Sequence, residues 1–202
     1  MICVIDYGMG NLRSVSKALE KLGETVEVSD RPPTLEKADK IVLPGVGAFG
    51  DGCRELQKKG FFDPLRQALL REKPFLGICL GMQLLFEESE ENPGVKGLGI
   101  FKGKVRRFQD PQIKVPHMGW NEMKIRDPKS PAFQGVSDRS FFYFVHSFYP
   151  APRENSIVLG TCEYGSEEFA AFVGKGSIWA SQFHPEKSQD TGLQILRNFV
   201  AL

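Results

Sequence analysis

The sequence predicts an α/β fold: a three-layer sandwich with a mostly parallel central sheet and an antiparallel section of strands and hairpins added in its second half. Two observations predict it. Up to about residue 90, short apolar runs alternate with segments of helical spacing, and this order implies parallel strands with helices on both faces. From about residue 94, β-prone runs follow one another with turns between them. Because 202 residues fit one domain, we expect a single domain over residues 1–202.

The first half contains four short apolar runs that we expect to be strands. They are residues 2–5, 25–28, 41–43 and 74–78. Asn11 is a suitable N-cap for a helix over residues 12–22, where apolar residues recur at helical spacing. Asp63 and Pro64 predict the start of a second helix, as an N-cap and N1 pair. After the fourth strand the spacing changes again and predicts a helix that continues to about Ser89.

The second half is rich in β-prone segments. Short strands are expected at residues 97–100, 102–108, 118–125, 141–148, 157–164, 169–173 and 178–183. Turn residues separate them, so we interpret them as hairpins that lead back to the central sheet. Ser188 is placed to cap a final helix that carries Leu193, Leu196 and Phe199.

Charge and cysteine content exclude several classes of protein. The chain has 26 basic and 25 acidic residues, a net charge of +1, so neither nucleic-acid binding nor an anionic membrane surface is indicated. No apolar run approaches the length of a membrane span, and the N-terminus lacks the basic region of a signal peptide. The four cysteines are far apart without a Cys-x-x-Cys pair, which argues against a zinc site or a disulfide framework. We therefore expect a cytoplasmic protein that needs neither a metal nor a cofactor.

Cys79 lies where the fourth strand gives way to a helix. Gly77 and Gly81 flank it two residues before and two residues after, which is the Gly-x-Cys-x-Gly pattern of a nucleophile elbow. So sharp a turn strains the nucleophile's backbone, and neighbours with a Cβ atom would clash there. A sulfur at a helix N-terminus also feels the positive end of the helix dipole, which favours the thiolate. A buried structural cysteine is the alternative, and the position at a strand end favours the nucleophile over it.

A thiolate nucleophile needs a base and a group that orients this base. His184 lies at the end of the apolar run 178–183, on the sheet edge that Cys79 shares if the two strands are parallel. Glu186 follows two residues later, so its carboxylate can reach the far imidazole nitrogen. The order Cys, His, Glu disfavours an α/β-hydrolase, in which the acid precedes the histidine. A dinucleotide site near the N-terminus is also disfavoured, because Arg13 replaces the third glycine of the fingerprint.

Six segments together resemble the class I (triad) glutamine amidotransferases. They are residues 5–14, 44–49, 77–83, 117–121, 145–149 and 182–188. The resemblance covers essentially the whole chain, and within the family it is strongest to the glutaminase subunits of imidazole glycerol phosphate synthases, which belong to histidine biosynthesis. It implies hydrolysis of L-glutamine to L-glutamate and ammonia. Because the chain ends one helix after His184, we expect the chemistry that uses the ammonia to lie on another polypeptide.

The resemblance implies a role for each matching residue. Cys79 would attack the glutamine carboxamide, His184 would protonate the departing ammonia and then activate water, and Glu186 would orient His184. Backbone N–H groups would hold the oxyanion, and the residues implied are Leu80 together with Val46 or Gly47. The residues implied to contact glutamine are Gly47, Gln83, Ser147 and Phe148.

The resemblance also implies a partner, a cyclase subunit that is a (β/α)₈ barrel and forms a 1:1 heterodimer with this chain. The residues implied at the contact are Trp120, Tyr143 and Lys187. The peptide at Val46 lies between Gly45 and Gly47, so it can rotate with little steric cost. We expect the isolated chain to be nearly inactive until the partner selects the productive orientation of this peptide.

Three other interpretations stay open on the sequence. The chain resembles other class I glutaminases too, such as that of pyridoxal phosphate synthase, and co-purification with the acceptor subunit would decide between them. A DJ-1-type cysteine-elbow protein carries a histidine directly after the nucleophile, where this chain has Leu80. A non-catalytic scaffold would not need the complete set of Cys79, His184 and Glu186.

Overall fold

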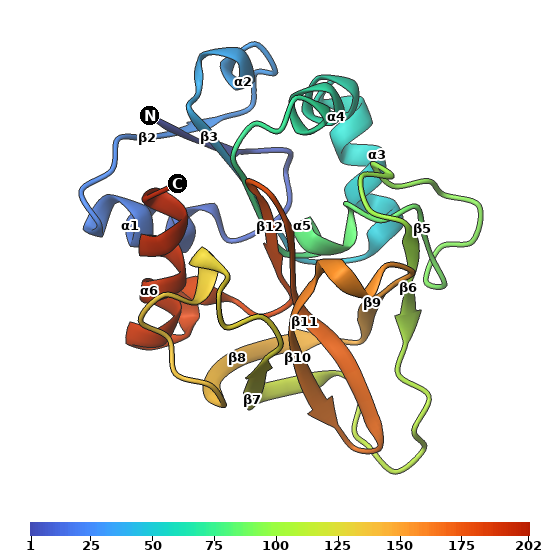
Figure 1. Ribbon diagram of the computed structural model, residues 1–202. Coiled ribbons are helices and arrows are strands. Elements are labelled where there is room, and N and C mark those ends of the chain that lie inside the picture. Colours follow the sequence, from blue (N-terminus) through green and yellow to red (C-terminus); the bar gives the residue numbers. More distant parts are fainter.

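The computed structural model describes the whole chain, residues 1–202, and its centre is one sheet of nine strands (Figure 1). In spatial order these are β2 (Val26–Ser29), β1 (Ile2–Ile5), β3 (Lys40–Gly45), β4 (Phe75–Cys79), β12 (Ile178–Ser181), β11 (Glu167–Lys175), β10 (Val158–Tyr164), β7 (His117–Ile125) and β8 (Ser140–His146). A second sheet consists of β5 (Glu88–Ser89), β6 (Gly103–Arg107) and β9 (Phe148–Pro152).

The large sheet changes character at β12. Every pairing from β2 across to β12 is parallel, and every pairing from β12 across to β8 is antiparallel. The predicted parallel first half and antiparallel second half are therefore confirmed. The two halves form one continuous sheet, in which β12, from the end of the chain, lies against β4, the strand that ends in Cys79.

Helices cover both faces of the parallel half, which confirms the three layers. Their bounds are α1 (Leu12–Lys21), α2 (Thr34–Lys37), α3 (Phe49–Lys58), α4 (Phe62–Leu70), α5 (Leu80–Gln83) and α6 (Gln189–Val200), and three short 3₁₀ helices cover Pro131–Phe133, Asn155–Ile157 and Pro185–Lys187. Side chains alternate along β1: Ile2 and Val4 belong to one core with α1 and α6, whereas Cys3 and Ile5 belong to another with α2, α3 and α4. Both faces of the strand are thus buried, as is typical of a parallel sheet.

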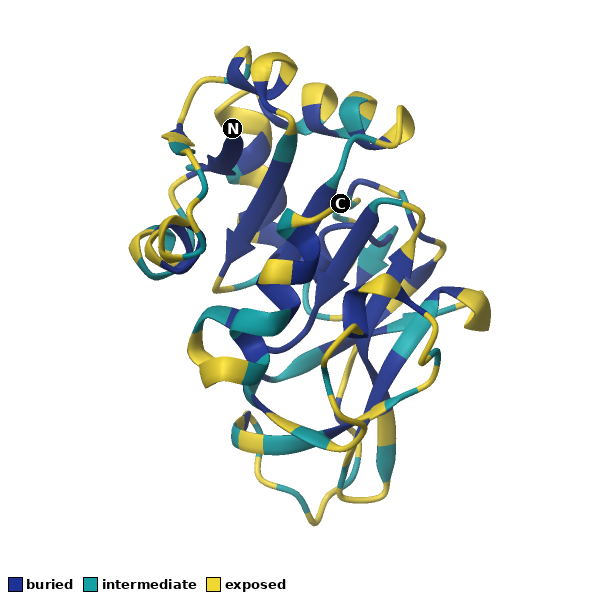
Figure 2. Ribbon diagram, turned by 60° about the vertical axis from the view of Figure 1, so that its left-hand side comes forward, coloured by how far each residue is buried: buried dark blue, intermediate teal, exposed yellow.

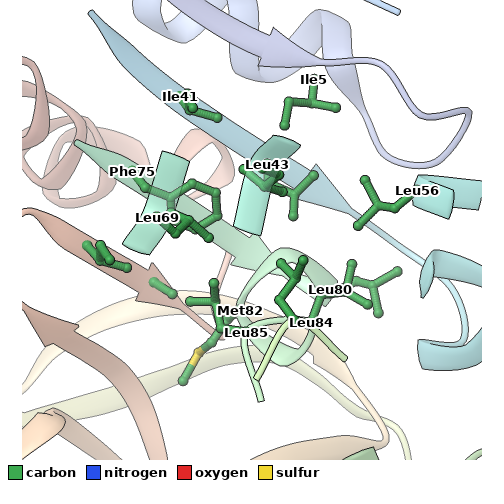
Figure 3. Packing of buried hydrophobic residues seen from close by; sticks show 14 of the residues in the cluster. Ile5, Ile41, Leu43, Leu56, Leu69, Phe75, Leu80, Met82, Leu84 and Leu85 are labelled. Atoms are coloured by element: carbon green, nitrogen blue, oxygen red, sulfur yellow. The ribbon is translucent and has the colours of Figure 1, made fainter. Parts of the chain in front are cut away.

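The core fixes the chain on either side of the nucleophile. Figure 2 shows the buried residues concentrated in the central strands, with exposed residues on the outer sides of the helices and in the loops. In Figure 3, Leu80, Leu84 and Leu85 point into the same cluster as Leu43 and Leu56. The segment after Cys79 is therefore held by apolar packing and has little freedom to move.

The predicted helix after Cys79 is shorter than expected. α5 ends at Gln83, and the prediction that it continues to Ser89 is wrong. The carbonyl groups of Leu84 and Leu85, which would continue a helix, instead accept hydrogen bonds from the backbone N–H groups of Leu98 and Ile100. Residues 97–100 were predicted as a strand, but they form a loop that is bonded to the segment directly after α5.

Other parts of the structure also differ from the prediction. The N-cap of α4 is Phe61 without a side-chain bond, so Asp63 and Pro64 lie inside its first turn. The predicted strand 141–148 is divided at Ser147, where the chain leaves one sheet for the other. α3 was not predicted, because Gly50 and Gly52 disfavour a helix. A Cβ atom at Gly52 would lie 3.1 Å from the Leu80 side chain, so the close packing accounts for that glycine.

Candidate active site

Cys79 is the N-cap of α5 and has an uncommon backbone conformation, φ 55° and ψ −105°. Its two flanking glycines are required by close approach. A Cβ atom on Gly77 would lie 2.7 Å from the Gly81 carbonyl oxygen, and one on Gly81 would collide with the carbonyl oxygen of Leu43. The strain at Cys79 is therefore imposed by tight packing of strand against helix, as the elbow pattern predicted.

The neighbouring strand brings a histidine to the same sheet edge. β4 and β12 are parallel, with Ile78 opposite Ser181, and His184 follows three residues later. Its Nδ1 lies 2.9 Å from Oε1 of Glu186, and both side chains are almost completely buried. The backbone N–H of His184 donates to the Tyr143 carbonyl, which ties this loop to β8. The predicted contact between His184 and Glu186 is present.

The environment of His184 favours its protonated form. Burial lowers the pKa of this imidazole, but the Cys79 and Glu186 side chains outweigh burial and raise it above the ordinary value. Nε2 of His184 is buried and has no hydrogen-bond partner within the chain. Since Nδ1 faces the carboxylate, Nε2 is the nitrogen left to exchange a proton with a group that reacts at Cys79.

A cavity of about 370 Å³ opens beside Cys79. It is lined by Gly47, Ala48, Cys79, Leu80, Gln83, Glu91, Pro116, Val145, His146, Ser147 and Phe148. The structure thus brings together all four residues that were expected to contact a substrate, namely Gly47, Gln83, Ser147 and Phe148.

The residues predicted to donate to the oxyanion lie next to the nucleophile, Leu80 in sequence and Val46 and Gly47 after the neighbouring strand. Leu80 is the first residue of α5, where a backbone N–H has no partner within the helix. Gly45 pairs with Cys79 across β3 and β4, so the following residues, Val46 and Gly47, leave the sheet beside the sulfur. Gly47 has φ 112°, a conformation that glycine tolerates. Val46 is 42% exposed and does not line the cavity.

Glu91 is a cavity residue that the sequence did not reveal. Its Oε2 accepts a hydrogen bond of 2.8 Å from the Phe49 backbone N–H, and Oδ1 of Asn92 accepts one of 2.7 Å from Gly50. These two side chains satisfy the N-terminus of α3 from a distant loop. Sequence reasoning missed Glu91 because it lies in a polar loop whose partners are 42 residues away.

Gln182 is a second residue that was missed. It is completely buried, and its Nε2 lies 3.6 Å from Sγ of Cys79. Its Oε1 accepts from Nε2 of Gln83 at 3.2 Å. In the sequence, Gln182 lies between an apolar run and His184. A polar side chain at that place was the one sign that this residue belongs to the site.

The residues expected at a partner surface lie together on β8 and its neighbours. Trp120 and Tyr143 are opposite one another in the β7–β8 pairing, with ring centroids 6.1 Å apart, and Nζ of Lys187 lies 5.8 Å from the Tyr143 ring. Met118 and Trp120 are 63% and 46% exposed. An exposed apolar patch of this kind is typical of an interaction surface.

The structure contains no cluster of three side chains suited to hold a metal ion, and none of its helices combines the length and apolar character needed to cross a membrane.

Known proteins resemble the chain over nearly its whole length. A family model described as glutamine amidotransferase class-I matches residues 3–202. Over 200 residues the chain is 50% identical to "Imidazole glycerol phosphate synthase subunit HisH" of Acinetobacter baylyi, covering 98% of this chain and 97% of that one. The protein of the same name from Syntrophotalea carbinolica is 51% identical over 205 residues, covering 98% of both chains.

Solved structures share the fold. One described as a crystal structure of glutamine amidotransferase superposes with a TM-score of 0.74 at 21% identity, covering 100% of this chain and 98% of the other. A second, described as PurLQS from Thermotoga maritima, gives a TM-score of 0.76 at 22% identity over 99% and 97% of the two chains. Identities this low bear on the fold alone, which they support over the complete chain.

Proposed function

The chain belongs to the class I glutamine amidotransferase family, and on this premise we propose that it is the glutaminase subunit of an imidazole glycerol phosphate synthase in histidine biosynthesis. One observation carries the proposal: the strained Cys79 and the buried His184–Glu186 pair lie at the ends of two adjacent parallel strands. The relatives with about half of their residues identical direct it to this synthase rather than to another member of the family.

The reaction begins with attack of the Cys79 sulfur on the side-chain carbonyl carbon of glutamine, which forms a tetrahedral oxyanion. His184 Nε2 gives its proton to the departing ammonia, and a thioester with Cys79 remains. His184 then accepts a proton from water, which attacks the thioester and releases glutamate. Glu186 holds Nδ1 throughout and stabilises the imidazolium. The N–H of Leu80 and one of Val46 or Gly47 stabilise the oxyanion.

The cavity fits the amino-acid part of glutamine. Glu91 is the one acidic residue among its lining residues, and its Oε2 is already bound to the Phe49 N–H. We assign the carboxylate of Glu91 to the α-ammonium group of the substrate, because an opposite charge gives the strongest hydrogen bonds. Gln83 can offer the substrate only its Oε1, because its Nε2 already donates to the Phe148 carbonyl and to Gln182.

The ammonia goes to a cyclase subunit that docks over the β7–β8 surface. Free ammonia at neutral pH is largely protonated and diffuses away, so a sheltered transfer between two subunits is required. Trp120, Tyr143 and Lys187 form the contact in this proposal, and residues 1–202 act as one domain. The acceptor is a (β/α)₈ barrel in a 1:1 heterodimer, as the relatives' synthase requires a second subunit.

The proposal is tested by the release of glutamate in the presence of the cyclase. The Cys79→Ala variant removes the nucleophile and is expected to abolish turnover, because no thioester can form. Cys162→Ala is the matched control, since Cys162 is equally buried but lies in β10, outside the cavity. Retained turnover in Cys79→Ala together with lost turnover in Cys162→Ala would show that the site is misassigned. Co-purification with a pyridoxal phosphate synthase subunit instead of the cyclase would identify the alternative synthase.

A further inference from the structure

We propose that Gln182 and the buried pair His117–His146 are positioning residues, which orient the Cys79 sulfur and the Gln83 amide through one continuous chain of hydrogen bonds. The inference rests on the proposed function, because it concerns the same sulfur and the same substrate cavity. It adds to that function two groups outside the cavity lining, Gln182 and His117, and a hydrogen-bonding role for His146, which also lines the cavity. The chain of bonds begins on the β7–β8 hairpin and ends at the nucleophile.

Near the nucleophile, the donor and acceptor of each hydrogen bond are fixed. Phe148 offers a carbonyl oxygen, which can only accept, so the group of Gln83 that lies 3.0 Å from it must be the amide Nε2. The same Nε2 donates to Oε1 of Gln182. Gln182 therefore presents its own Nε2, and not its oxygen, to Sγ of Cys79. An N–H donor at this point stabilises a thiolate and holds it in place.

The far end fixes the Phe148 carbonyl from the other side. His146 Nδ1 lies 2.9 Å from this oxygen and must therefore carry the proton. A neutral His146 then has an acceptor at Nε2, where Nδ1 of His117 lies 3.1 Å away and must donate. Each ring thus has a single possible tautomer, with its proton on Nδ1.

Asn121 is the end of the hydrogen-bond chain that lies farthest from Cys79. Its Nδ2 donates to His117 Nε2 at 3.2 Å and to the Glu163 carbonyl at 2.9 Å. Its Oδ1 accepts from the Glu122 backbone N–H at 2.8 Å, which excludes the flipped amide. The backbone groups of Glu122 and Phe148 therefore fix the direction of every hydrogen bond from Asn121 to Cys79.

The two rings lie in an apolar enclosure that keeps them neutral. The side chains packed against them are Phe108, Phe144, Tyr164 and Phe169. Burial lowers the pKa of His117 to about 4. For His146, burial, with smaller contributions from His117 and His184, lowers the pKa to about 3. The tyrosines nearby face other partners, Tyr149 donating to Glu167 and Tyr164 to the Lys114 carbonyl.

A neutral pair at physiological pH acts as a fixed support. If His146 were protonated, two N–H groups would face one another across the contact with His117, in addition to the cost of a buried charge. The support matters because three cavity residues lie where β8 ends and β9 begins, namely His146, Ser147 and Phe148. An alternative account is that the pair only fills the core, and this predicts that any ring of similar size would serve.

The first test reads the tautomers directly in the full-length chain. The protein contains three histidines, so a ¹⁵N–¹H spectrum of histidine-labelled protein is readily assigned. We expect His117 and His146 to carry the proton on Nδ1 and to keep it without titration between pH 5.5 and 8. A proton on Nε2 of His146, or titration of either ring in that range, overturns the inference.

The second test separates positioning from filling of the core. His146→Phe keeps a ring but removes both hydrogen bonds, whereas His146→Asn keeps a donor near Nδ1 for the Phe148 carbonyl. In the complex with the cyclase we expect His146→Phe to raise KM for glutamine by about tenfold. The increase in KM for His146→Asn should be several-fold smaller. Tyr164→Phe, which removes only the hydroxyl bound to Lys114, is the control and should match the parent. Equal KM values for the two His146 variants overturn the inference.

The third test does not need glutamine. Gln182→Met removes the donor to Cys79 without a large change in volume, so we expect iodoacetamide to alkylate Cys79 at least about threefold more slowly at pH 7, as followed by peptide mass spectrometry. Alkylation at the parent rate overturns the inference. If the parent complex fails to hydrolyse glutamine, the proposed function is wrong, while the tautomers and the alkylation rates still decide this inference. The same two measurements decide it if a His146 variant does not fold.

Discussion

Oε1 of Glu186 lies 2.9 Å from Nδ1 of His184, and both side chains are shielded from solvent. Two residues so close in sequence make this contact because the short 3₁₀ helix over Pro185–Lys187 turns the carboxylate back toward the ring. The carboxylate is one of the groups that keep His184 protonated against the effect of burial. Together with the Cys79 side chain, the pair therefore extends to higher pH the range in which the histidine can act as an acid.

The Glu186→Gln variant is expected to lower kcat by at least about 100-fold, because the imidazolium loses its partner and its fixed tautomer. The pKa of His184 is raised in the folded protein, so its imidazole stays protonated to a higher pH than that of an ordinary histidine. Removing the carboxylate lowers this pKa, and the alkaline limb of the pH–rate profile should move to lower pH. A profile of kcat/KM against pH in the complex measures it, and an unshifted alkaline limb contradicts the assigned role.

The Glu91→Gln variant should raise KM for glutamine by about 10- to 100-fold with little change in kcat. The amide can still accept from the Phe49 N–H, so the α3 terminus is preserved, but the charge opposite the substrate ammonium is lost. Steady-state kinetics with the cyclase present measures both constants. Glu90→Gln is the neighbouring control, because Glu90 pairs with Lys104 at the surface. The same KM in both variants would remove Glu91 from the binding site.

The Lys187→Ala, Tyr143→Ala and Trp120→Ala variants should weaken the complex and the coupling between glutamine hydrolysis and product formation. The reason is that Trp and Tyr supply large rigid contacts and that Lys187 lies over the Tyr143 ring. We expect an increase in Kd of about tenfold or more for at least one of them, measured by titration calorimetry, with unchanged circular dichroism. Leu70→Ala is the control, because Leu70 is exposed on α4. Parent-like affinity and coupling in all three variants would exclude this surface.

The isolated chain should hydrolyse glutamine at least about tenfold more slowly than the complex, mainly in kcat, because one oxyanion donor is missing until the partner docks. Rates for the chain alone, with the cyclase, and with the cyclase and its nucleotide substrate measure this effect. Val46→Pro, which has no N–H, should lose about 100- to 1000-fold of the activated rate if Val46 supplies that donor. Equal rates in all three conditions would exclude the gating, and the triad would be unaffected.

The sequence was sufficient for the parts of the site that are encoded locally. The elbow needs Gly77 and Gly81 within two residues of Cys79, and the His184–Glu186 pair spans three residues, so both are visible as short patterns. The α/β alternation likewise revealed the parallel half, since buried strands and amphipathic helices differ in periodicity.

Long-range contacts were beyond the sequence. Glu91 reaches the N-terminus of α3 across 42 residues, and Gln182 reaches Cys79 across 103. No local pattern encodes such pairs, because they are created by the order of strands in the sheet. The end of α5 was mispredicted for the same reason, since Leu98 and Ile100 take the carbonyl groups that a longer helix would have used.

The position of β12 between β4 and β11 has a consequence for synthesis on the ribosome. The chain leaves the ribosome from its N-terminus, so β4 emerges long before the strand that will pair with its free edge. Until β12 arrives, the growing polypeptide carries a fully apolar strand with an unpaired edge, which is prone to join other chains. The same order means that a truncated product ending before His184 has a cysteine elbow but no proton donor. An incomplete chain of this kind therefore combines an unpaired apolar strand edge with a nucleophile that has no histidine beside it.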